Sequence, residues 1–155
     1  FESDILIREA MQEKSEDSQK WIMPCKGTIS SPYGWRTHPI TKERTFHKGI
    51  DIAVPIGTPV KAVADGKIYT VGTATGYGYW VVIDHGKING ITVTSEYGHI
   101  SRWEKEIKKG ITVKKGNIIA YSGNTGHSNG PHVHLTLREG PFKGQHVNPY
   151  KYIKG

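Results

Sequence analysis

The stretch that decides the fold class is Tyr79-Trp-Val-Val-Ile-Asp-His-Gly-Lys-Ile-Asn-Gly-Ile-Thr-Val-Thr-Ser-Glu-Tyr97. Its first five residues are aromatic or β-branched, which is typical of a buried strand, and Asp84-His85-Gly86 is expected to end that strand. Residues 91–97 alternate between apolar and polar side chains, as a half-buried strand does. Two such runs in succession indicate a sheet rather than a helix.

Further short runs of the same kind occur at residues 59–63, 66–71, 117–122 and 132–137. Turn residues such as Asp65-Gly66 separate them. Only residues 101–109, followed by Gly110, are predicted to form a short helix in this part of the chain. Short strands and tight turns, without a regular alternation of strands and helices, predict a mostly β, antiparallel fold.

The composition agrees with many turns and excludes two classes of protein. The 155 residues include 19 glycines, about 12% against a typical value of about 7%. No apolar run approaches the roughly 18 residues that a transmembrane helix needs. The single cysteine, Cys25, excludes an internal disulfide and a zinc site built from cysteines.

The net charge of +7 is unevenly distributed, because residues 1–20 carry −3 and the remainder carries +10. Residues 1–20 lack glycine and proline, so we expect a helical or frayed linker there and a globular domain over residues 21–155. The chain starts at Phe1 without a signal-peptide pattern, so we expect a further domain upstream. A cationic domain favours an anionic polymer as partner. Nucleic acid is not expected, since no reader motif is present.

Two short motifs could bind a metal ion. In an extended chain, His47 and Asp51 of His47-Lys-Gly-Ile-Asp51 point to one face, with Gly49 leaving space between them. In a strand, both imidazoles of His132-Val-His134 share a face as well. Imidazole and carboxylate are good zinc ligands, and a catalytic zinc typically keeps three protein ligands and one open position. Each motif alone is weak, because the sequence contains eight histidines.

The sequence around these motifs resembles the zinc endopeptidases of the lysostaphin/LytM type. The similar blocks are Ser31-Pro-Tyr-Gly-Trp-Arg-Thr-His-Pro-Ile-Thr41, Phe46-His-Lys-Gly-Ile-Asp-Ile-Ala-Val-Pro-Ile-Gly-Thr-Pro-Val60, Tyr97-Gly-His-Ile-Ser101, Ser122-Gly-Asn-Thr-Gly126, Gly130-Pro-His-Val-His134 and Val147-Asn-Pro149. They occur in the family's order and at family-like spacing. The resemblance implies an antiparallel β-sheet groove fold.

The resemblance also implies a set of site residues. One Zn²⁺ would be bound by His47, Asp51 and His134, and His99 and His132 would be catalytic. The glutamate of a His-Glu-x-x-His helix is missing, and histidines with an unperturbed pKa near ~6.5 can replace it in proton transfer. Which of the two is the base and which is the donor stays open.

Three further residues are candidates for contacts with the substrate, namely Arg36, Asn124 and His127. Arg36 is interpreted either as an ion-pair partner or as a contact for a substrate carboxylate. The other histidines, His38, His85 and His146, are interpreted as structural. The sequence departs from the family pattern after His-x-His. Leu135 and Thr136 stand where the family often has an aromatic residue and an acid. We expect this to change the contacts that orient the metal ligand His134.

The implied substrate is the peptide cross-link of bacterial peptidoglycan, which places the protein outside the bacterial cytoplasm. The context of His47 looks closer to relatives that cut D-alanyl cross-links, so the bond from D-Ala to diaminopimelate is the expected target. A secreted autolysin, a cell-division hydrolase and a phage tail enzyme are all compatible with this interpretation. The alternative is a non-catalytic module that binds peptidoglycan or regulates another enzyme. The presence of all five metal and catalytic positions favours the enzyme.

Overall fold

The computed structural model describes residues 20–38, 40–126, 128, 130–141 and 144–153. The predicted linker therefore lies outside the described residues, except for Lys20. Within the described part of the chain, no helix is long and apolar enough to cross a membrane.

The regular structure of the described residues consists of β-strands and one 3₁₀ helix. The strands are β1 (Thr28–Ser31), β2 (Gly34–Thr37), β3 (Arg44–His47), β4 (Ile50–Ala53), β5 (Pro59–Lys61), β6 (Gly66–Ala74), β7 (Gly78–Ile88), β8 (Ile91–Trp103), β9 (Thr112–Val113), β10 (Ile118–Ser122), β11 (His132–Glu139) and β12 (Gln145–Val147), and the 3₁₀ helix η1 covers Pro149–Lys151. The strands pair antiparallel throughout. The predicted fold class is confirmed.

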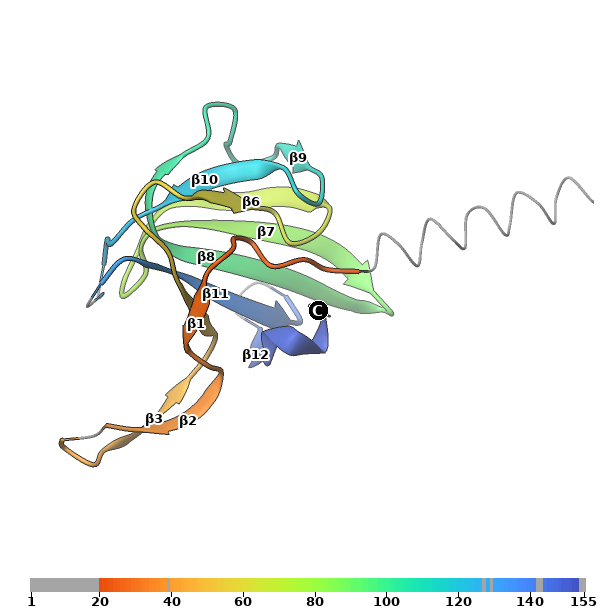
Figure 1. The fold of residues 1–155 in the computed structure, drawn as a ribbon. Helices are drawn as coiled ribbons and strands as arrows, with labels where there is room; N and C mark the ends of the chain where they lie inside the picture. Colours follow the sequence, from red (N-terminus) through yellow and green to blue (C-terminus); the bar gives the residue numbers. More distant parts are fainter. Residues whose placement is uncertain (1–19, 39, 127, 129, 142–143, 154–155) are drawn as a thin grey trace, which may run out of the picture.

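Ten of these strands form one sheet, in which the long path runs β1-β4-β11-β8-β7-β6-β9 (Figure 1). β10 joins it by pairing with β5 and with the end of β8, and β12 pairs with β11. β11 therefore lies between β4 and β8. This position brings together three segments that are far apart in the sequence.

Alternation along β11 and β4 separates the core from the opposite face of the sheet. Val133, Leu135 and Leu137 of β11 are fully buried, as are Ile50 and Ile52 of β4. Successive side chains of a strand point to opposite faces. The intervening residues of both strands, which include the two histidines of His-x-His, therefore share the other face.

The hairpin of β7 and β8 contains the stretch 79–97, and its first strand is longer than predicted. β7 continues through residues 84–86 to Ile88, and the pairing with β8 shifts register between Asp84 and Lys87. Gly86 has φ +74°, which a bulge accommodates without strain. The chain reverses at Asn89-Gly90, where both residues have positive φ. The prediction that Asp84-His85-Gly86 ends the strand is wrong, because these residues form a bulge within it.

The helix predicted over residues 101–109 is also wrong. β8 extends to Trp103, and Arg102 and Trp103 pair with β10. The Glu104 N–H then donates to the Ile119 carbonyl at 2.8 Å, which keeps the segment tied to the sheet. Pairing with a neighbouring strand satisfies these backbone groups better than an isolated turn of helix would.

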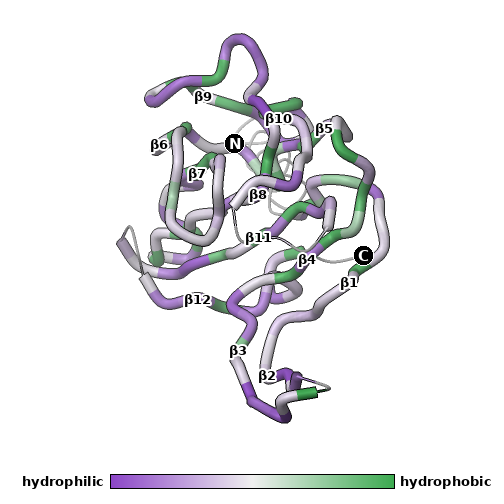
Figure 2. Tube along the Cα trace, turned by 90° about the vertical axis from the view of Figure 1, so that its left-hand side faces the viewer, coloured by the Kyte–Doolittle hydropathy of each residue, from purple (hydrophilic) through white to green (hydrophobic). Residues whose placement is uncertain are grey.

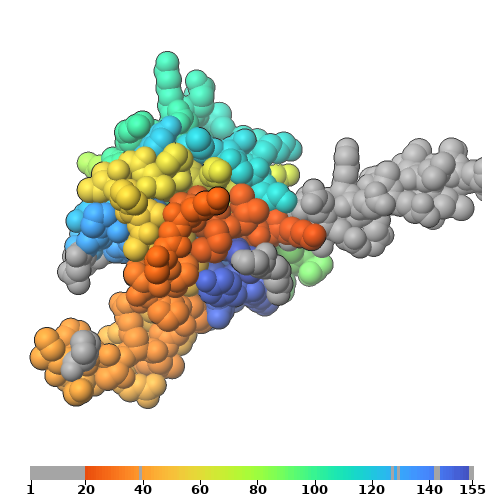
Figure 3. Space-filling model, viewed as in Figure 1, coloured from red at the N-terminus to blue at the C-terminus, as the bar shows by residue number. Residues whose placement is uncertain are grey.

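β2 and β3 form a separate hairpin that extends away from the main sheet (Figures 1 and 3). Trp35 is 64% exposed on it, and its ring packs edge-on against Phe46 with the Arg44 guanidinium 5.1 Å above. Hydrophilic residues dominate the far end of the hairpin (Figure 2). The base of the hairpin is His47, so this arm leads directly into the candidate site.

Candidate active site

Strand register places Asp51 and His134 directly opposite each other. In the pairing of β4 with β11, Asp51 faces His134 and Ala53 faces His132. His134 Nδ1 lies 2.8 Å from Asp51 Oδ1. The predicted common face of the two His-x-His imidazoles is confirmed, with Val133 buried on the other side.

His47 reaches the same carboxylate from the end of β3. Its Nε2 lies 3.3 Å from Asp51 Oδ2, and its Nδ1 donates to the Pro32 carbonyl at 2.9 Å. Gly49 is needed here for a different reason than the sequence suggested. A Cβ at this position would lie 2.1 Å from the Leu135 carbonyl oxygen, so the absence of a side chain allows β11 to approach closely.

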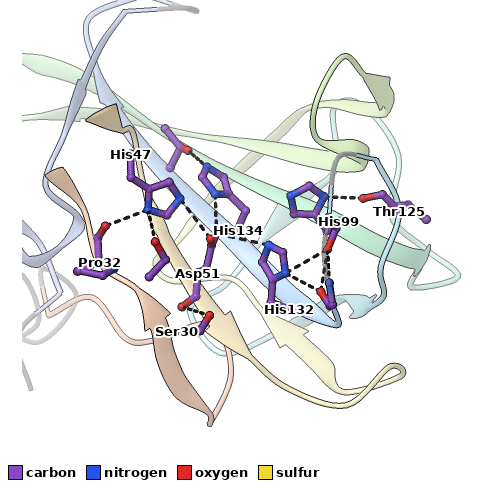
Figure 4. Close-up of polar contacts among 12 residues, drawn as sticks. Ser30, Pro32, His47, Asp51, His99, Thr125, His132 and His134 are labelled. Atoms are coloured by element: carbon purple, nitrogen blue, oxygen red, sulfur yellow. Dashed lines mark hydrogen bonds and ion pairs between the residues drawn. The ribbon is translucent and has the colours of Figure 1, made fainter. Parts of the chain in front are cut away.

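The three side chains offer a donor set that suits zinc. One ligand atom from each of His47, Asp51 and His134 lies within 4.8 Å of the others (Figure 4). Burial opposes ionisation of Asp51, but hydrogen bonds to His134 and His47 hold the pKa of its carboxyl well below the usual range. Two imidazoles and an ionised carboxylate are the ligand types of a catalytic zinc site with an open position.

His99 enters the site through an irregularity in β8. Its φ is +60°, and the register between β7 and β8 shifts over this region. A bulge of this kind turns a side chain out of the normal alternation. His99 Nδ1 donates to the Thr125 carbonyl at 2.5 Å, while burial and the neighbouring histidines lower the pKa of the imidazole. The other ring nitrogen, Nε2, is left available.

His132 lies beside His99, with ring centroids 4.6 Å apart. Its Nδ1 donates to the Gly130 carbonyl at 2.7 Å, and its Nε2 is 3.5 Å from Asp51 Oδ1. Figure 4 shows both rings next to the group formed by His47, Asp51 and His134. The backbone carbonyls thus orient both imidazoles so that, among the residues that the structure describes, Nε2 has no backbone partner in either ring.

These residues line a cleft of about 630 Å³. Arg36 also lines it, is exposed, and donates from Nη1 to Ser31 Oγ at 2.6 Å. Asn124 is exposed and lines neither this cleft nor the smaller one that adjoins it, although its neighbour Thr125 accepts a hydrogen bond from His99. His127 lies outside the described residues. The structure therefore brings Arg36 to the site and leaves Asn124 at its margin.

The sequence interpretation missed a polar chain behind His134. His134 Nε2 is 2.8 Å from Thr136 Oγ1, and the Tyr77 hydroxyl is hydrogen-bonded to both Thr136 and Arg138. Arg138 Nε donates to Glu96 Oε2 at 3.0 Å. Thr136 and Arg138 continue the alternation of His132 and His134, so the period of two along β11 could have placed them on this face. Tyr77 and Glu96 come from other parts of the chain, and no local pattern pointed to them.

The remaining described histidines make structural contacts. His38 Nδ1 accepts the N–H groups of Ile40 and Thr41 in the β2–β3 turn. His85 contacts the Asp65 carbonyl and Ser95 Oγ, each at 2.7 Å. His146 Nδ1 is 2.8 Å from the Tyr33 hydroxyl.

Known proteins share this arrangement of sequence and fold. The model of peptidase family M23 matches residues 45–149. The DD-carboxypeptidase/endopeptidase Mpg of Neisseria meningitidis serogroup B is 45% identical over 121 residues, which cover 78% of this chain and 26% of that protein. This chain thus spans about a quarter of the length of that relative.

Two solved structures have the same fold. The catalytic domain of lysostaphin from Staphylococcus simulans has a TM-score of 0.71 at 31% identity, covering 83% of this chain and 93% of that domain. A zinc-containing peptidase from Vibrio cholerae has a TM-score of 0.70 at 30% identity, covering 88% of this chain and 39% of that protein.

The family match, the zinc-containing relative and the His–Asp–His donor set agree on one zinc ion as the cofactor. On the match over residues 45–149, the chain belongs to peptidase family M23, a family of metallopeptidases.

Proposed function

We propose that this protein is a zinc-dependent endopeptidase that hydrolyses the peptide cross-links of bacterial peptidoglycan. The observation that carries the proposal is the convergence of five side chains in one cleft. Three of them, His47, Asp51 and His134, form the metal-binding group, and two additional histidines lie beside it. A binding module would have no need for two oriented imidazoles next to a metal group.

The proposal assigns zinc binding to His47, Asp51 and His134. When bound, zinc would polarise the scissile carbonyl and lower the pKa of a coordinated water toward about 7. The Pro32 carbonyl oxygen lies 2.9 Å from His47 Nδ1 and accepts its proton. This contact fixes the ring so that Nε2 faces the site. In His134 the roles of the two nitrogens are exchanged. Thr136 Oγ1 contacts Nε2 at 2.8 Å, and Nδ1 faces Asp51. Such outer contacts orient metal ligands and set their tautomer.

The proposal assigns proton transfer to His99 and His132 as a pair. Because each donates its Nδ1 proton to a backbone carbonyl, Nε2 is the nitrogen of each ring that can take up or release a proton. A neutral Nε2 accepts a proton from the attacking water. The protonated ring can then donate to the developing oxyanion or to the leaving amine. The 4.6 Å separation of the rings allows one peptide group to contact both.

The favoured bond in this proposal is the one from D-Ala to diaminopimelate. The relative Mpg is named for DD-carboxypeptidase and endopeptidase activity, and it is 45% identical to this chain. Peptidoglycan lies outside the bacterial cytoplasm, so the proposal places the protein there as well. Its cationic body suits a cell wall, which carries many carboxylates.

The test is cleavage of defined muropeptide dimers by the zinc-loaded protein, followed by mass spectrometry of the products. We expect each dimer to give two monomers whose summed mass exceeds that of the dimer by one water, with a new amine on diaminopimelate. Removal of zinc by a chelator should stop the reaction, and adding zinc back should restore it. Intact dimers in the presence of protein with one bound zinc would support a non-catalytic module and refute the proposal.

A further inference from the structure

A second cleft adjoins the first and shares two of its residues. Its volume is about 330 Å³, and His99 and His134 line both clefts. Phe46 and Tyr77 form apolar walls, and Lys48 and Arg138 supply positive charge. The metal-binding group therefore lines the first cleft and borders the second through His134, so a peptide that extends past His134 would enter the second cleft.

The charge of the second cleft is not balanced by its own residues. The Arg138 guanidinium is matched by Glu96, to which its Nε donates at 3.0 Å, and its Nη1 donates to the Gly144 carbonyl. Lys48 is exposed and forms neither a hydrogen bond nor an ion pair with any residue that the structure describes. One uncompensated ammonium group thus remains beside the metal-binding group.

His146 gives independent support for the position of this charge. Burial and then the positive charges of Arg138 and Lys48 lower the pKa of His146, so both cations lie near the same imidazole. His146 packs on Phe46 with ring centroids 5.2 Å apart, and Phe46 lines the second cleft. The positive charges of Arg138 and Lys48 are therefore felt at the wall of the second cleft that Phe46 forms.

We propose that the second cleft is a carboxylate subsite, in which Lys48 binds the free α-carboxylate next to the nitrogen of the scissile bond. This inference rests on the proposed function and specifies its substrate. In a cross-link from D-Ala to diaminopimelate, the carbon attached to the scissile nitrogen carries a free carboxylate. In a glycine bridge, the same carbon is followed by another neutral peptide group. That carboxylate is only a few covalent bonds away from the scissile carbonyl. If the carbonyl lies at the metal-binding group, the carboxylate can therefore reach the adjoining cleft.

The first cleft is less suited to this role. Its cation, Arg36, already donates to Ser31 Oγ, and Ser31 Oγ lies 3.3 Å from His47 Nδ1. Arg36 is thus connected to the support of a proposed metal ligand. Lys48 has no such contact among the described residues and keeps all three of its donors.

The test uses two cross-linked peptides that differ only in this carboxylate, which is free in one and a primary amide in the other. We expect the zinc-loaded wild type to have a kcat/KM about 10- to 100-fold higher for the acid, as a charge-assisted contact allows. Lys48→Met should abolish the preference, so that the ratio of kcat/KM for the acid to that for the amide falls to about 1. Lys48→Arg should restore most of the preference.

The control is Lys67→Met, a matched loss of one exposed lysine on β6 that lines neither cleft. It should keep the preference for the acid. Equal wild-type rates on both peptides would overturn the subsite while leaving the proposed function intact. Loss of the preference in Arg36→Met but not in Lys48→Met would also overturn it. Failure to cleave either peptide with zinc bound would instead refute the proposed function.

Discussion

Thr136 lies directly behind His134 on β11. Its hydroxyl contacts His134 Nε2 at 2.8 Å and is also hydrogen-bonded to Tyr77. A buried acid is close, because Glu96 lies opposite Thr136 in the register of β8 and β11 and is 1% exposed. Hydrogen bonds through Arg138 and Tyr77 connect this carboxylate to Thr136.

Removal of this hydroxyl should weaken zinc binding without unfolding the sheet. Thr136→Val keeps the shape of the side chain but leaves His134 Nε2 without its partner, so we expect a 10- to 100-fold lower zinc affinity. Competition with a chromophoric chelator measures it. Thr94→Val is the matched control, because Thr94 Oγ1 is buried without a partner on the same sheet. An unchanged zinc affinity in Thr136→Val would show that the contact plays no part.

His85 gives the fold a pH dependence away from the site. Burial lowers its pKa to about 4. Between pH 6.5 and 4 the unfolded chain therefore binds a proton that the folded protein does not, and stability decreases as the pH falls through this range. The full effect is about 3 kcal/mol. Urea unfolding of wild type and His85→Asn at pH 7 and pH 4.5 measures it. Equal loss of stability in both proteins on acidification would contradict the assignment.

At the scale of elements, the approach of β11 to the β3–β4 connection creates the site. Gly49 permits this approach, since a Cβ there would lie 2.1 Å from the Leu135 carbonyl. Gly49→Ala should therefore cost at least about 1–3 kcal/mol of stability, as overpacking does, and should weaken zinc binding by displacing His47. Chemical denaturation and zinc titration measure the two effects. Gly130→Ala serves as the control for stability, because a Cβ there meets nothing within 4 Å.

The elements also show what the sequence could and could not predict. The alternation of His132-Val-His134 predicted both the core and the site face of β11, because a strand fixes side-chain direction. The position of His99 in the site depends on a bulge at φ +60°, which no local pattern indicated; only the family resemblance identified this residue. The predicted helix over residues 101–109 failed because β10, a strand from later in the chain, pairs with that segment. Lys48 was missed because its role depends on a neighbouring cleft rather than on its neighbours in sequence.

At the scale of the molecule, the cationic body should attract the protein to cell walls. Residues 21–155 carry a net charge of +10, whereas the wall is anionic. Salt shortens the range of this attraction to about 3 Å at 1 M. We therefore expect the fraction that sediments with purified walls to fall as NaCl rises from 50 to 500 mM. Cleavage of a small soluble cross-linked peptide should change less. Binding that does not depend on salt would contradict the electrostatic account.

The whole account depends on a division of roles within one cleft, in which three residues hold zinc and two others transfer protons. The most direct measurement determines bound zinc and the rate of muropeptide cleavage on the same preparations of His134→Ala and His99→Ala. We predict that His134→Ala loses zinc and activity together, whereas His99→Ala keeps one zinc per chain and loses at least about 100-fold in rate. Cleavage by His99→Ala at the wild-type rate, or full zinc content in His134→Ala, would contradict the account.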